Sequence, residues 1–315
     1  MNKVVIMYHS ADHDGHASAA IIQKHLKFET TQEPILYPIN HGEEIKWEMF
    51  DKNTTVWMAD FSLCGKEFVK LLDSVGLFVW IDHHETPIKD AIKMDPRFES
   101  LPGKRVYGNK FSGCELAWQY CFGSEPMPSF IHRWGRFDVW DHSDEKTWDD
   151  VYEPFELGTQ RFDTDPKSNP AFWERLFSEG QYGPQGDTKW DVIEKGRAIQ
   201  HYVAEESRKA MASAYEIEFE GMTCLALNTK SKGSQQFGEL LKKYPVCLTY
   251  RYDGQDDQWV VGVYSDNVKG KVYETPPVDV SKIAAKYGGG GHGGAAGFQL
   301  KSITELREFF FQGRQ

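Results

Sequence analysis

The chain has 315 residues, of which 40% are hydrophobic and 26% charged, and its formal net charge is −11. This length favours two domains of ordinary globular composition, and no apolar run approaches the ~18 residues that a membrane span needs. The acidic balance disfavours binding of long nucleic acid, because such affinity depends on Lys and Arg displacing counterions from phosphates.

The first half alternates short apolar runs with helical patterns. Strands are expected at 4–8, 35–37, 54–59 and 77–81, with helices between them, such as 16–27. Apolar runs that alternate with helices predict an α/β fold with a mostly parallel sheet and helices on both faces. Ser112 and Glu115 have the spacing of a capping box, which predicts the start of another helix.

The pattern changes after this first domain, which we place at 1–190. Residues 142–189 combine scattered aromatic residues with Pro and Gly, which indicates an insertion or lid. A helix over 191–214 is expected to link the domains, and 215–315 form a smaller α/β domain across a cleft. In that domain we expect a hairpin over 215–227, strands at 246–252 and 259–264, a helix capped by Asp279 and a final helix at 304–310.

His and Asp residues follow three predicted strands of the first domain. HSADHDG (9–15) follows the first of them, Asp60 follows the third, and Asp82-His83-His84 follow the fourth. Each group alone has an ordinary interpretation as turn residues, a helix cap or a surface pair. Together they predict one site, because the carboxyl ends of parallel strands meet at the same edge of a sheet. Imidazole and carboxylate ligands without thiolates suit Mn²⁺ or a similar divalent ion, and Mg²⁺ less well.

With these motifs the sequence resembles the DHH phosphoesterase superfamily. Asp82-His83-His84 match its name motif, HSADHDG and Asp60 match its first and second motifs, and Asp138 matches its fourth. Residues 287–298 (YGGGGHGGAAGF) are similar to the glycine-rich signature of the DHH-associated domain. The branch most resembled contains the nanoRNases, oligoribonucleases of the NrnA and NrnB kind, which degrade short oligonucleotides to mononucleotides and often dephosphorylate 3′-phosphoadenosine 5′-phosphate.

The resemblance implies a role for each matched residue. One metal ion would be held by His9 and Asp12, and the second by Asp14, His83 and Asp138, with Asp60 bridging both. His9 lies three residues before Asp12, whereas many relatives place it four before, so Ser10 or a water could take its position. His84 would face the substrate phosphate, and Asp82 would orient the histidines.

In the second domain the resemblance implies a substrate-binding segment. Many relatives carry an arginine in the strand before the glycine signature, and Arg251 is the substitute that this chain offers. The residues expected to contact substrate are Gly289, Gly290, Gly291, His292, Gly293 and Arg251.

The resemblance thus implies a hydrolase of phosphoric ester bonds, a phosphodiesterase or exonuclease in which two divalent ions, preferably Mn²⁺, activate water. Alternatives are a cyclic nucleotide or cyclic dinucleotide phosphodiesterase, a 3′-phosphoadenosine 5′-phosphate phosphatase, and a nucleotide sensor without activity. We expect short oligonucleotides or small nucleotides as partners, no long nucleic acid and no membrane, and a homodimer stays open. Five cysteines without a C-x-x-C pair predict a reduced, cytoplasmic protein.

Overall fold

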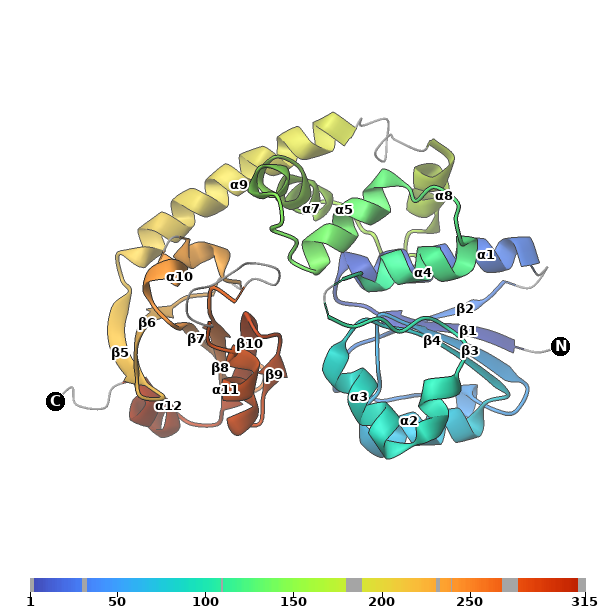
Figure 1. The fold of residues 1–315 in the computed structure, drawn as a ribbon, viewed down its shortest axis with the longest axis horizontal. Coiled ribbons are helices and arrows are strands. Elements are labelled where there is room, and N and C mark those ends of the chain that lie inside the picture. Colours follow the sequence, from blue (N-terminus) through green and yellow to red (C-terminus); the bar gives the residue numbers. More distant parts are fainter. Residues whose placement is uncertain are drawn as a thin grey trace. The chain divides into compact units, whose positions relative to one another are not determined.

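The computed structural model describes residues 3–29, 33–108, 110–179, 189–230, 233–238, 240–267 and 277–310. The chain divides into two compact units, Met1–Arg197 and Ala198–Gln315 (Figure 1). Each unit has its own sheet and its own hydrophobic core.

A four-stranded sheet lies at the centre of the first unit. Its order is β2-β1-β3-β4, and every neighbouring pair is parallel. This confirms the predicted parallel sheet and places β2 and β4 at its two edges. The strands are β1 (Lys3–His9), β2 (Ile35–Ile39), β3 (Thr54–Ala59) and β4 (Leu77–Ile81).

Successive side chains of a strand point to opposite faces of the sheet, and here both faces are buried in a hydrophobic core. Ile6 and Tyr8 contribute to one core, and Val5 and Met7 to the other. Figure 1 shows helices on both faces of the sheet. On one face lie α1 (His13–Glu29) and α4 (Gly113–Phe122), and on the other α2 (Gly65–Ser74) and α3 (Glu85–Met94). Short 3₁₀ turns lie at η1 (Trp47–Met49) and η2 (Pro96–Ser100).

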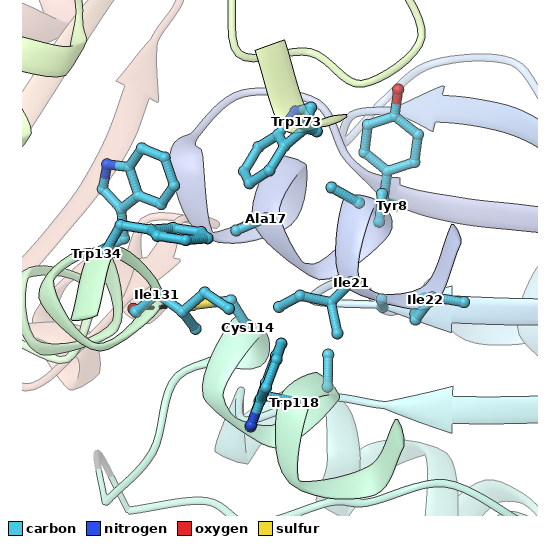
Figure 2. Close-up of a cluster of buried hydrophobic side chains, with 14 of the residues drawn as sticks. Tyr8, Ala17, Ile21, Ile22, Cys114, Trp118, Ile131, Trp134 and Trp173 are labelled. Carbon is cyan, nitrogen blue, oxygen red and sulfur yellow. Dashed lines mark hydrogen bonds between the residues drawn. The ribbon is translucent and has the colours of Figure 1, made fainter. Parts of the chain in front are cut away.

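A further helical layer packs on α1 and α4. Figure 2 shows Trp134 and Trp173 beside Ala17 and Ile21 of α1, and all four side chains are buried. Trp173 belongs to the segment whose composition indicated an insertion or lid, and the described part of that segment contributes to this core. The layer contains α5 (Ser129–Asp138), α6 (Glu145–Thr147), the π-helix η3 (Trp148–Tyr152), α7 (Glu153–Thr159) and α8 (Pro170–Glu179).

The second unit is built on a six-stranded sheet in the order β5-β6-β7-β8-β10-β9. β5 and β6 form the antiparallel hairpin predicted from the sequence, β6 and β7 are parallel, and the other neighbours are antiparallel. The strands are β5 (Tyr215–Phe219), β6 (Met222–Asn228), β7 (Cys247–Asp253), β8 (Gln258–Tyr264), β9 (Gly290–Gly291) and β10 (Ala295–Leu300).

Helices of the second unit include two that the sequence predicted. Asp279 caps α11 (Val280–Lys286) by accepting from the N–H of Ser281, and α12 (Ile303–Phe310) is the last helix described. The boundary between the units falls within the long helix α9 (Lys189–Met211). Shorter elements are η5 (Gln235–Phe237) and α10 (Leu240–Lys243). Among the described residues, no helix combines the length and apolar character needed to cross a membrane.

Candidate metal centre

The turn after β1 brings His9 and Asp12 together. The Asp12 carboxylate accepts from the N–H of Gly15 at 2.9 Å, and its other oxygen lies 2.7 Å from His9 Nδ1. Gly15 permits this turn, because a Cβ at that position would lie 2.1 Å from the carbonyl oxygen of His9. The spacing of three residues between His9 and Asp12 therefore does bring the imidazole to the carboxylate.

Asp60 follows β3 and lies beneath the centre of the site. Its side chain is 2% exposed, and its backbone has a φ of +53°, which few residues other than Gly, Asn, Asp and His adopt. The N–H of Asp60 donates to the carbonyl of Ile81 at 2.9 Å, which ties the ends of β3 and β4 together. Gly113 lies against this carboxylate so closely that a Cβ there would be 2.7 Å from Asp60 Oδ1.

Asp14 is held by the start of α4. Its two carboxylate oxygens accept from the N–H groups of Gly113 at 2.6 Å and Cys114 at 2.8 Å. These N–H groups have no partner within their helix, and the positive end of the helix dipole favours a carboxylate there. The predicted capping box is present, since Ser112 and Glu115 exchange side-chain and backbone hydrogen bonds.

Asp138 is brought to the site at the end of α5. Its carboxylate lies 3.3 Å from His83 Nε2. α5 is fastened to α4 by Arg136, whose guanidinium donates through Nε at 3.1 Å and also through Nη2 to the buried carboxylate of Glu115. Gly135 permits this contact, because a Cβ there would lie 2.7 Å from Glu115 Cδ.

These residues form three overlapping groups of potential metal ligands. His9, Asp12 and Asp60 make the first triad, and Asp14, His83 and Asp138 make the second. Asp60, His83 and His84 form a third group between them, and in each group the potential ligand atoms lie within 4.8 Å of one another. Asp60 Oδ2 is 3.9 Å from His9 Nδ1, whereas Asp60 Oδ1 is 3.2 Å from His83 Nε2. The two oxygens of one carboxylate therefore point to different triads, as a bridging ligand requires.

Buried atoms of the site lack the hydrogen bonds that proteins normally supply. Asp60 Oδ1 and His83 Nε2 are both buried, and neither makes a hydrogen bond. Unsatisfied buried polar groups are uncommon in folded proteins because each costs roughly 1–3 kcal/mol. The lone pairs of these two atoms are thus free to coordinate a cation.

The charges of the site favour the same interpretation. Burial and the neighbouring carboxylates of Asp14 and Asp12 raise the pKa of Asp60 well above its usual range. Burial and the nearby His84 lower the pKa of His83, so this imidazole stays neutral, which is the form that binds metals. A cation between the carboxylates would remove their mutual repulsion.

Asp82 orients the second histidine of its motif. Its buried carboxylate accepts from the N–H of His83 at 2.7 Å, from His84 Nδ1 at 2.8 Å and from the hydroxyl of Ser62. Burial would raise the pKa of Asp82, but the charge and hydrogen bond of His84 outweigh it and lower that pKa to about 2. The same contact raises the pKa of His84 against the opposing effect of burial.

The glycine-rich segment lies in the second unit, at the outer edge of its sheet. Gly291 has a φ of +141°, and a Cβ there would lie 2.6 Å from the carbonyl oxygen of Ala295. The N–H of His292 donates to the same oxygen at 2.7 Å, and Gly293 accepts from Val280 at 2.9 Å. The segment is thus fixed in one conformation by its backbone contacts.

Arg251 lies on β7, opposite Val260 of β8, which in turn pairs with Gln299 of β10. The guanidinium forms an ion pair with Asp253 at 3.1 Å. Its expected contact with substrate stays a prediction.

Several residues of the site were missed by sequence reasoning. The end of β2 contributes Asn40 and His41, and the only signal was a pair of polar residues after an apolar run. Gly113 and Arg136 act through contacts that are distant in sequence, and no local pattern indicated them.

Comparison with known proteins finds little similarity in sequence and clearer similarity in fold. No family model matches the chain. The uncharacterized protein R106 of Acanthamoeba polyphaga mimivirus is 24% identical over 317 residues, which cover 97% of this chain and 69% of that protein. Among solved structures, the pGpG-specific phosphodiesterase PggH from Vibrio cholerae matches with a TM-score of 0.52 and 12% identity, covering 97% of this chain and 95% of that one. RecJ from Thermus thermophilus, in complex with Mg²⁺, has a TM-score of 0.41 and 14% identity over 95% of this chain and 47% of its own.

The chain therefore has the fold of the DHH phosphoesterases. This is the fold that the resemblance implied, on the evidence of Asp82-His83-His84 and the order of the other motifs. The comparisons do not separate the nanoRNase branch from its relatives.

Proposed function

We propose that this protein is a metal-dependent phosphodiesterase that hydrolyses short linear oligonucleotides and releases mononucleotides. One observation carries the proposal: the Asp60 carboxylate lies between two triads of imidazole and carboxylate groups, with one oxygen towards each. Such a pair of adjoining sites suits two-metal hydrolysis of a phosphodiester.

The donor set supports two divalent ions, and Mn²⁺ in particular. His9, Asp12 and Asp60 would hold one ion, and Asp14, His83 and Asp138 the other, with Asp60 shared. Nitrogen and carboxylate oxygen donors without thiolates suit Mn²⁺, and Mg²⁺ accepts imidazole less readily. When bound, such a pair supplies an activated water and neutralises the oxygens of the phosphoryl group.

The remaining residues would orient the substrate. His84 is held through Nδ1 by Asp82, so its ring has a fixed direction and a raised pKa, which suits a donor to a phosphoryl oxygen. Gly289, Gly290, Gly291, His292 and Gly293 would bind the far part of the substrate, since glycine lets a phosphate approach backbone N–H groups. Arg251 is proposed as a further contact to the substrate, although its guanidinium also pairs with Asp253.

A short linear substrate is favoured over a long strand for two reasons. The net charge of −11 gives long nucleic acid little electrostatic attraction. PggH, whose fold this chain shares along nearly its whole length, is a phosphodiesterase specific for the dinucleotide pGpG. We therefore place dinucleotides first among the substrates to be tested.

The test is a substrate panel assayed with Mn²⁺. It contains pGpG, other 5′-phosphorylated dinucleotides, longer oligomers, 3′-phosphoadenosine 5′-phosphate, cyclic mono- and dinucleotides, and pyrophosphate. We expect mononucleotides from the dinucleotides and no release of phosphate from pyrophosphate. Binding of dinucleotide without any turnover would instead identify a sensor.

Two variants connect the activity to the site. Asp60→Asn keeps a residue that tolerates the positive φ, and His83→Ala removes the neutral imidazole. Each should lower kcat/KM by more than about a hundredfold, which exceeds the usual effect of removing a residue that only supports a ligand. His201→Ala, at an exposed position of α9, is the control that should leave activity unchanged. Full activity in Asp60→Asn would refute the two-metal assignment.

A further inference from the structure

The end of β2 completes the row of strand ends at the site. The register pairs Ile39 of β2 with His9 of β1, and the N–H of Ser10 donates to the carbonyl of Ile39 at 3.1 Å. The next residues are Asn40 and His41, and Asn40 Oδ1 accepts from the backbone N–H of His41 at 2.8 Å. This contact fixes the backbone from which the His41 imidazole extends.

The His41 imidazole lies beside the first triad. Its ring is 4.9 Å from the ring of Phe61 and 5.9 Å from that of His9. Phe61 follows Asp60 in the chain and is buried. Its ring also stacks on that of His9 at 6.0 Å, so Phe61 packs against both imidazoles. His41 itself is exposed, and its outer edge is accessible to a ligand.

The strand order places two imidazoles on either side of the ligand set. β2 and β4 are the two edges of the sheet, so His41 extends from one edge and His84 from the other. His9 and Asp60 follow the two central strands between them.

The first unit offers a phosphate few other donors at this place. Within the described residues, the ion pairs that Asp12, Asp14, Asp60 and Asp138 form are with histidine alone. The nearby guanidinium of Arg136 is occupied by Glu115 and Asp141. A phosphoryl group above the triads would therefore meet imidazole donors from the two edge strands.

We propose that His41 is a substrate-binding residue that donates a hydrogen bond to a non-bridging phosphate oxygen, on the β2 side of the site, while His84 does so on the β4 side. This inference rests on the proposed function, because it takes a phosphodiester as the ligand. It assigns His41 to phosphate recognition and excludes it from the metal ligands.

The experiment compares His41→Ala and His41→Gln with wild type and with His201→Ala. Binding of a dinucleotide whose two bridging oxygens are both replaced by methylene is measured by calorimetry on the full chain loaded with Mn²⁺, and KM and kcat are measured with pGpG. We expect His41→Ala to raise both Kd and KM about tenfold, the effect of losing one hydrogen bond to a charged group. His41→Gln retains an N–H donor and should recover most of this affinity, which a purely structural role of the ring would not produce.

A separate titration with Mn²⁺ alone should give the same stoichiometry and affinity in all four proteins. Unchanged Kd in His41→Ala overturns the proposal, and so does loss of a metal ion, which would make His41 a ligand. The binding measurement also separates this inference from the proposed hydrolysis. If wild type binds the analogue but turns over no substrate, the proposed hydrolysis is wrong, while a tenfold effect in His41→Ala still supports the phosphate contact. If the Mn²⁺-loaded wild type does not bind the analogue, both the proposed hydrolysis and the phosphate contact are wrong.

Discussion

Asp60 is held in a position that is unfavourable for the protein without a cation. It combines a positive φ, which is uncommon outside glycine, with burial among other carboxylates, which is costly for its ionised form. Strain of this kind is typical of functional sites, where stability is lower than the fold alone would allow. The cost should appear in the stability of the metal-free protein and disappear when a divalent ion binds.

Replacement of Asp60 by Asn should therefore stabilise the metal-free protein. Because the folded-state pKa of Asp60 is raised, its ionised form is disfavoured on folding. The destabilisation is full above that pKa, decreases as the pH falls below it, and vanishes below the ordinary pKa of an aspartate. Asn has no charge and tolerates the backbone, and we expect a gain of about 0.5–2 kcal/mol near neutral pH. Urea unfolding in the presence of a chelator measures this gain, which should narrow as the pH is lowered.

Asp82→Asn is the matched substitution with the opposite expected sign. The folded-state pKa of Asp82 is lowered to about 2, so its ionised form stabilises the fold at all pH values above the ordinary pKa of an aspartate. That contribution is lost as the pH falls towards 2. We expect Asp82→Asn to lose roughly 2 kcal/mol near neutral pH, from the size of the shift. If the free energy of unfolding changed in the same direction in Asp60→Asn and Asp82→Asn, the distinction between a destabilising ligand and a stabilising supporting residue would be wrong.

At the scale of elements, the sequence predicts what depends on neighbouring residues. The strand that ends at His9 and the strand that ends at Ile81 are continuous apolar runs, so their place in a parallel sheet was evident. The start of α4 was equally local, since Ser112 and Glu115 are three residues apart. The convergence of strand ends then followed from topology alone.

What the sequence did not predict depends on contacts between distant segments. Gly113 lies 53 positions after Asp60, and nothing near either residue indicates that a Cβ would separate them. Arg136 and Glu115 join two helices through a contact of 21 positions. Trp173 lies in a segment rich in turn residues, and only the packed core shows that its ring is buried. The periodic patterns of strands and helices, which repeat every two to four residues, carry no information on such distant pairs.

Gly113→Ala tests whether α4 sets the position of the bridging carboxylate. The added methyl would meet Asp60 Cβ at 2.6 Å and Oδ1 at 2.7 Å, and both residues are buried. We expect a loss of about 1–3 kcal/mol in stability from overpacking, together with weakened Mn²⁺ binding. Gly254→Ala is the control, since its Cβ would make only an ordinary contact at 3.6 Å. Normal Mn²⁺ affinity in Gly113→Ala, measured by calorimetry, would show that Asp60 can move without consequence.

At the scale of the whole molecule, the proposed ligands all belong to one unit. His9, Asp60, His83 and Asp138 lie within Met1–Arg197, whereas the glycine-rich segment lies within Ala198–Gln315. A cation that binds only the folded first unit stabilises that unit by RT ln(1 + [L]/Kd), about 2.7 kcal/mol at a hundredfold excess over Kd. The six-stranded sheet of the second unit offers no comparable group of ligands among its described residues.

We therefore expect Mn²⁺ to slow amide exchange in the first unit and to leave the second unit unchanged. Hydrogen exchange followed by mass spectrometry on the full chain, with Mn²⁺ or with a chelator, measures both units in one sample. The greatest added protection should fall on peptides covering the ends of β1, β3 and β4 and the start of α4, where Asp14 and Asp60 are held. Asp60→Asn should lose this added protection while peptides from β5 to β10 behave as in wild type. Equal protection of both units by Mn²⁺ would mean that the ions bind elsewhere, because a cation held only by the triads has no ligand in the second sheet.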